Sequence, residues 1–144
     1  PSGQVRRLPV IDGQQRLTTM SILLKVIFDV VSKENRKKIK KTVLDCLFQQ
    51  NEKDEYESRI RHSRNDRDDF EFVIGKVNTK EIDDDVIHEI TSPILEPDSK
   101  KKNSKSQIIK CYKYFYETLK KLSEEEVMNY YSLLCPDQSK QNDN

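Results

Sequence analysis

The sequence is 144 residues long, the size of one domain, and its 34% hydrophobic against 35% charged residues favour amphipathic elements around an economical core. The 26 basic and 25 acidic residues nearly cancel, so no overall charge would attract DNA or an anionic membrane, and any nucleic-acid contact must be local. No apolar run reaches the roughly 20 residues that span a bilayer, and Cys46, Cys111 and Cys135 lack the paired spacing of a zinc or redox site, which favours a cytoplasmic protein without membrane contact.

The first predicted elements are a strand and a long helix. Residues 5–11 are typical of a short strand, with Pro9 favouring an edge position. Apolar residues then repeat at helical spacing until about Ser32, at Leu17, Met20, Leu23, Leu24, Ile27, Phe28 and Val31. This helix is apolar nearly all round, so we expect partners on several sides. Because the chain opens without an initiator Met, on a turn that enters a strand, we expect a fragment of a longer protein.

The middle of the chain predicts three further helices. Residues 35–48 form an amphipathic pattern with a lysine-rich outer face. Asn65 is a good N-cap for a helix that turns Phe70, Val73, Ile74 and Val77 inward. The residues between them, 51–63, have a loop-like and then an extended pattern. We expect Ile82 to Ile90 to form another short helix.

Residues 93–105 contain two prolines and a lysine run, which predicts a linker. Residues 106–136 predict a helical extension of two helices, divided at Ser123, which forms a capping-box pattern with Glu126. Residues 137–144 are polar enough to predict a disordered tail. With one convincing strand, the predicted fold class is α/β to mainly α, a truncated strand-turn-helix unit followed by a helical extension.

Asp12 and Gly13 stand where the predicted strand turns into the long helix. A helix start leaves backbone N–H groups unpaired and exposes the positive end of the helix dipole, which attracts anions. Gly13 permits a tight turn and a close phosphate, and Arg16 can reach the same anion with forked hydrogen bonds. Asp12 can hold Mg²⁺ or orient a water molecule, and Gln14 or Gln15 can position base, ribose or water. The corner therefore fits a nucleotide-phosphate site.

The same corner also fits a purely structural interpretation, in which Asp12 caps the helix and Gly13 eases the turn. Asp66 and Arg67 are open to a similar choice, between a second pocket wall and an ordinary helix start.

Other candidates have equally plain alternatives. Asp84 and His88 are four residues apart, which suits either a shared metal or ordinary helix-dipole partners. The lysines of 37–41 and 100–102 suit either DNA phosphates or a solvated surface. Tyr114 lies off the apolar stripe of its helix and is the aromatic residue placed to stack on a base.

Three segments resemble one protein family. Residues 11–19, Ile-Asp-Gly-Gln-Gln-Arg-Leu-Thr-Thr, resemble the signature of the ParB/sulfiredoxin-like domain that opens GmrS and other GmrSD-type type IV restriction proteins. Residues 65–71, Asn-Asp-Arg-Asp-Asp-Phe-Glu, resemble the family's downstream helix start. Residues 106–115, Ser-Gln-Ile-Ile-Lys-Cys-Tyr-Lys-Tyr-Phe, resemble a later family helix. The matches follow in family order and span most of the chain.

The resemblance implies a nucleotide-binding and hydrolysing regulatory part of a phage-defence restriction system that acts on modified foreign DNA. It implies a nucleoside triphosphate with Mg²⁺ as cofactors, and a separate HNH nuclease domain or subunit as partner. The implied nucleotide-binding residues are Asp12, Gly13, Gln14, Gln15, Arg16, Thr18 and Thr19, of which Asp12, Gln15 and Arg16 are the implied catalytic residues and Asp12 the Mg²⁺ ligand.

The implied domain division is a partial nucleotide-binding region over 1–92, the linker, the helical extension and the tail. The family's usual upstream strands, with a Gln-Arg-Pro-like segment, are missing here, as is any HNH constellation, since His62 and His88 are isolated. The other hypothesis is a non-catalytic helical interaction or DNA-recognition module.

Overall fold

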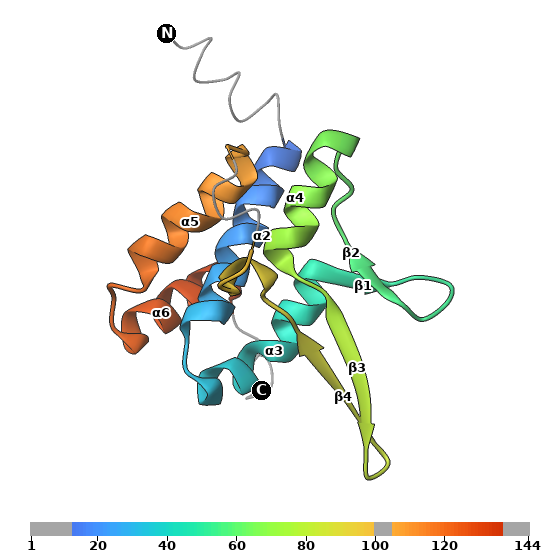
Figure 1. Ribbon diagram of the computed structural model, residues 1–144. Helices are drawn as coiled ribbons and strands as arrows, with labels where there is room; N and C mark the ends of the chain where they lie inside the picture. The colour runs from blue at the N-terminus through green and yellow to red at the C-terminus, as the bar shows by residue number, and fades with distance from the viewer. Residues whose placement is uncertain (1–12, 100–104, 137–144) are drawn as a thin grey trace, which may run out of the picture.

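The computed structural model describes residues 13–99 and 105–136, which form a mixed α/β structure with a helical majority, as the sequence predicts (Figure 1). Within these residues the elements are α2 (Gly13–Val30), α3 (Lys33–Leu47), β1 (Phe48–Gln50), β2 (Tyr56–Ser58), α4 (Arg64–Ile74), β3 (Val77–Ile82), β4 (Asp85–Ile90), the 3₁₀ helix η1 (Pro93–Leu95), α5 (Gln107–Leu119) and α6 (Glu124–Leu134). In the described ranges, no helix is long and apolar enough to cross a membrane.

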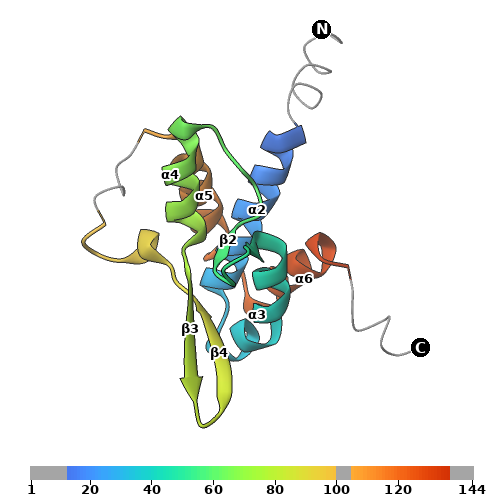
Figure 2. The ribbon, with the colours of Figure 1, turned by 90° about the vertical axis from the view of Figure 1, so that its right-hand side faces the viewer.

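Helix α2 is the centre of the structure and packs against α3, α4, α5 and α6. Val26 and Ile27 on its middle turns are completely buried, which confirms that this helix has neighbours on several sides. The expectation that Leu17 and Met20 join the core was wrong, because their exposed fractions are 57% and 42%. Helices α3 and α6 cover only the later turns of α2, so its first turns project beyond them (Figure 2).

Local capping fixes the ends of α3 and α6. The Ser32 side chain accepts a hydrogen bond from the Asn35 N–H at the start of α3. Ser123 and Glu126 form the predicted capping box at the start of α6, each side chain bonding the other's backbone N–H. The Glu124 carboxylate reaches from α6 to the Ser32 N–H at 2.9 Å and to the Asn35 side-chain amide at 2.6 Å. These contacts join α6 to the turn between α2 and α3.

Residues 82–90, expected to be a helix, instead belong to an antiparallel hairpin in which β3 pairs with β4 from Val77↔Ile90 to Ile82↔Asp85. Ile82, Val86 and Ile90 are spaced by four residues, which also satisfies a helical template. The β-branched content and the two-residue turn at Asp83 and Asp84, whose φ values of 52° and 68° suit a hairpin, favour the strands. The hairpin extends away from the helices (Figures 1 and 2).

A second hairpin pairs β1 with β2. Strand β1 begins at Phe48, the last residue of the expected helix, and β2 lies within residues 51–63, expected to be a loop and then an extended segment. Helix α4 begins two residues earlier than expected, because Ser63 and not Asn65 occupies its N-cap position. Its inward residues Phe70, Val73 and Ile74 are buried as predicted, whereas Val77, expected on the same helix face, begins strand β3. Gly75 ends this helix at a φ of 80°, and a Cβ there would stand 1.9 Å from the Thr91 carbonyl oxygen, so glycine is required where the β3–β4 hairpin begins.

Part of the predicted linker is packed, since Ile94 in η1 is buried against the core. The division into domains at this segment stays a prediction. The predicted strand 5–11, the lysines 100–102 and the predicted tail 137–144 lie outside the described residues.

Candidate functional site

Helices α2, α4 and α5 begin at the same end of the molecule (Figure 1). The three helices also pack against one another. Each helix start presents the positive end of a helix dipole and backbone N–H groups that have no partner within the helix. At α5 the Ser106 side chain accepts hydrogen bonds from two of these groups, the N–H groups of Ile108 and Ile109. This end of the molecule therefore combines three local preferences for negative charge, although the whole chain is nearly neutral.

A pocket of about 440 Å³ opens where these three helices meet, and we call it the three-helix pocket. Its volume falls within the range of small-molecule sites, roughly 300 to 1,000 Å³. Its walls combine hydroxyl, amide, imidazole and carboxyl groups with an apolar part: they consist of Gln15, Thr18, Thr19, Ile22, His62, Ser63, Asp66, Gln107, Ile108 and Cys111.

The structure places three of the implied nucleotide-binding residues, Gln15, Thr18 and Thr19, in the wall of this pocket. Arg16 lies exposed on the same turn of α2. Gly13 is the first residue of α2 and Gln14 follows it, while Asp12 lies outside the described residues.

The two residues expected to form a second wall are divided between two pockets. Asp66 lines the three-helix pocket, whereas Arg67 lines a neighbouring pocket of about 240 Å³. His62 belongs to the walls of both. The two motifs that resemble a family signature at 11–19 and 65–71 therefore meet in space, and the third, at 106–115, joins them through Gln107, Ile108 and Cys111.

His62 is the residue that the sequence interpretation missed. Its Nε2 atom lies 2.8 Å from Oγ1 of Thr18, which is buried, and its ring packs on Phe70 with 4.3 Å between centroids. This contact ties the segment before α4 to the second turn of α2. An isolated histidine carries no sequence pattern, and the available signal was only its place directly before the helix that begins the second motif.

The start of α4 has capping-box spacing but shows no capping bond. Ser63 and Asp66 are three residues apart, like Ser123 and Glu126, yet the Ser63 side chain makes no capping hydrogen bond. Both Ser63 and Asp66 instead line the three-helix pocket.

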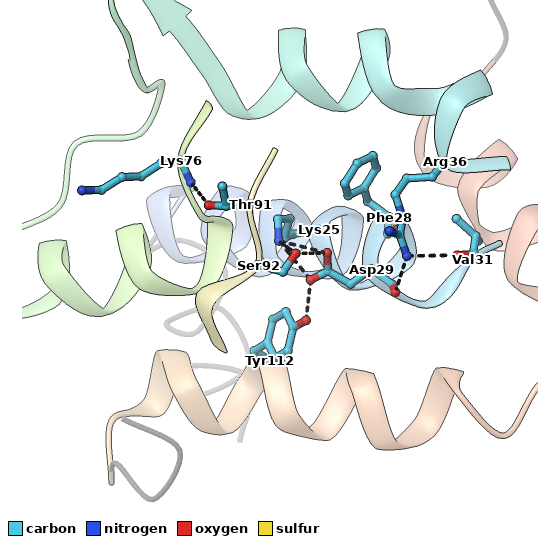
Figure 3. Close-up of polar contacts among 9 residues, drawn as sticks. All are labelled: Lys25, Phe28, Asp29, Val31, Arg36, Lys76, Thr91, Ser92 and Tyr112. Atoms are coloured by element: carbon cyan, nitrogen blue, oxygen red, sulfur yellow. Dashed lines mark hydrogen bonds and ion pairs between the residues drawn. The ribbon is translucent and has the colours of Figure 1, made fainter. Parts of the chain in front are cut away.

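A buried polar network holds α5 and the segment after β4 against α2 (Figure 3). The Lys25 ammonium donates to both Asp29 carboxylate oxygens at 3.0 Å and to Ser92 Oγ at 2.9 Å. Ser92 and Tyr112 each donate a hydroxyl hydrogen bond to Asp29. Side chains of Lys25 and Asp29 are 0% and 1% exposed. The sequence signal was a Lys and an Asp four residues apart inside a helix that is otherwise apolar.

Burial changes the acid–base properties of this region. Removal from water lowers the pKa of Lys25, and the neighbouring Asp29 carboxylate partly opposes this shift. Burial, reinforced by Asp29, raises the pKa of Tyr112, so its hydroxyl remains a donor. Burial also raises the pKa of Cys111, so the thiol in the pocket wall stays protonated at neutral pH.

The remaining candidates lie elsewhere. His88 on β4 approaches Thr79 Oγ1 at 3.2 Å through Nδ1 and packs edge-on against Tyr56, while Asp84 sits in the hairpin turn. Across 13–99 and 105–136, no group of three or more His, Cys, Asp or Glu side chains is arranged to hold a metal ion. Tyr114 is exposed, as expected, and so are Lys37, Lys38 and Lys41 on α3.

The sequence model of one protein family matches almost the whole chain. It covers residues 2–143 and is described as "GmrSD restriction endonuclease, N-terminal domain". No curated protein and no solved structure matches the chain.

Proposed function

Because this chain belongs to the family of GmrSD restriction endonuclease N-terminal domains, and so to a phage-defence restriction system, we propose that it binds and hydrolyses a nucleoside triphosphate in the three-helix pocket. One observation carries this proposal. Residues from all three segments that resemble the family, at 11–19, 65–71 and 106–115, line one pocket of ligand size.

The proposed ligand lies with its phosphates at the start of α2. Backbone N–H groups at Gly13 and the Arg16 guanidinium supply donors for the phosphate oxygens there. The sugar and base enter the pocket, where Ile22 and Ile108 give an apolar contact. The positive dipole end at the start of α2 favours the negative charge of the phosphates.

Mg²⁺ is commonly held by one or two carboxylates together with phosphate oxygens and water, and the carboxylate proposed for it is Asp12. The pocket wall fits a metal that arrives with the nucleotide, since the hydroxyls of Thr18 and Thr19 and the Gln15 amide offer further oxygen ligands. The bound ion would neutralise charge that develops on the phosphates.

In the proposed reaction a water molecule attacks the terminal phosphorus, the bond to the bridging oxygen breaks, and the nucleoside diphosphate and inorganic phosphate leave. Gln15 orients the water molecule, and Arg16 stabilises the charge on the transferred group. We propose that hydrolysis regulates cleavage of modified DNA by an HNH nuclease part outside this chain.

The test is calorimetric titration of the full-length restriction protein with each nucleoside triphosphate in Mg²⁺ buffer. We expect Arg16→Ala to weaken binding by at least tenfold, because it removes a charged donor to phosphate. Lys38→Ala on α3 removes the same charge from a distant exposed position and should leave the dissociation constant unchanged.

Two results would overturn the proposal: no binding of any nucleoside triphosphate, or equal affinity for the wild type and Arg16→Ala. Salt-sensitive DNA binding that is retained in Arg16→Ala and lost in Lys38→Ala, together with either result, would establish the DNA-recognition module instead.

A further inference from the structure

The three-helix pocket has one strongly polarised wall. Among the described residues that line it, Asp66 is the only one with a carboxylate, and the other polar groups there are hydroxyls, amides, the His62 ring and the Cys111 thiol. An ionised carboxylate accepts hydrogen bonds and donates none. It repels a phosphate, so this side of the pocket suits a neutral part of the ligand that carries hydrogen-bond donors.

The start of α4 differs from the capped start of α6. In α6, the Glu126 carboxylate accepts a hydrogen bond from the Ser123 N–H, and the Ser123 hydroxyl accepts one from the Glu126 N–H. At the equivalent positions of α4, the Ser63 side chain forms no such bond, and Ser63 and Asp66 both line the pocket. The pair thus contributes one residue with a hydroxyl and one with a carboxylate to the wall of the same pocket.

The distribution of charged and apolar groups around the pocket defines the orientation of the proposed ligand. Phosphates belong at the start of α2 beside Arg16, and the apolar residues Ile22 and Ile108 suit the face of a base. The sugar joins phosphate to base, and its hydroxyls are neutral donors that every ribonucleotide carries, whereas the N–H donors of the bases differ from one base to the next.

We propose that Asp66 accepts a hydrogen bond from the ribose 2′-hydroxyl, so that the pocket selects ribonucleoside over 2′-deoxyribonucleoside triphosphates. The proposal rests on the proposed function and adds the class of nucleotide. A hydrogen bond to a charged acceptor, lost with the 2′-hydroxyl, accounts for a preference of about 10- to 100-fold.

The experiment compares dissociation constants of the full-length protein for a ribonucleoside triphosphate and its 2′-deoxy counterpart with the same base. The wild type is expected to prefer the ribonucleotide by the factor above. Asp66→Ala should bring the ratio close to one by weakening the ribonucleotide alone, and Asp66→Asn, which keeps an acceptor without the charge, should give an intermediate ratio.

Asp68→Ala and Asp68→Asn are the matched controls, since Asp68 is exposed in the same helix and is absent from the pocket wall. These variants should keep the wild-type ratio. Equal affinity of the wild type for both nucleotides would overturn the proposal, and so would an equal loss for both in Asp66→Ala, which would place Asp66 on the Mg²⁺ ion or phosphates. If the wild type binds neither nucleotide, the proposed function itself fails.

Discussion

At the scale of single residues, Lys25 and Asp29 are the most constrained positions described. Each ion has been taken out of water, which costs several kcal/mol, and the cost is offset only by their mutual contact and by the hydroxyls of Ser92 and Tyr112. The network binds α2, α5 and the segment after β4 together, and the first turns of α2 and α5 form walls of the three-helix pocket. The buried network therefore influences the pocket indirectly, by holding in place the helices that form its walls.

We expect Asp29→Ala to lower the free energy of unfolding by about 3–5 kcal/mol, because Lys25 would remain buried without its counterion. Urea denaturation measures this change. Glu117→Ala, which breaks the exposed Glu117–Lys120 pair on α5, should cost no more than about 1 kcal/mol. Replacing both Lys25 and Asp29 by apolar residues of similar volume should restore most of the loss. An Asp29→Ala variant as stable as Glu117→Ala would contradict this account.

At the scale of elements, α6 is attached to the α2–α3 turn through one carboxylate. The pKa of Glu124 is held below its ordinary value of 4.5, first by the hydrogen bond from the Ser32 N–H and next by that from Asn35. A carboxyl whose pKa is lowered on folding stabilises the folded state above its unfolded pKa, and this contribution is lost as the pH falls through the folded pKa.

Glu124→Gln is therefore expected to lower the melting temperature at pH 7, and the difference from wild type should shrink once the pH falls below 4.5. Thermal melts across that range make the measurement. Glu125→Gln changes the adjacent exposed carboxylate of the same helix turn and should show no comparable pH-dependent gap. A gap for Glu124→Gln that stays constant with pH would exclude the ionised carboxylate as its cause.

At the scale of the whole molecule, helix α2 determines both the core and the pocket. Its middle turns are enclosed, while its first turns carry Gln15, Thr18 and Thr19 to the pocket and leave Leu17 exposed. Truncating Ile27 to Ala should cost about 2–5 kcal/mol, whereas Leu17→Ala should change stability by less than about 0.5 kcal/mol. Chemical denaturation of the two variants of one helix makes the comparison, and equal losses would contradict the described packing.

The sequence predicts the helices well, because amphipathic spacing and capping patterns such as Ser123 with Glu126 are local. It does not show how far each helix is covered by its neighbours, and so Leu17 and Met20 were assigned to the core. It also misassigned residues 82–90, where spacing by four fits a helix and a strand alike. Of the candidate site, the chain positions of Gln15, Thr18 and Asp66 were predictable, but the contact between Thr18 and His62 joins residues 44 apart and needs the fold.

The buried network also restricts how this domain can change over time. Any single mutation that removes one charge of the Lys25–Asp29 pair leaves the other stranded in the core, while a joint apolar replacement would be tolerated. Replacing the two residues one at a time thus passes through a single mutant that folds poorly. The loss of stability in each single variant therefore favours keeping both residues, even if neither contacts a ligand.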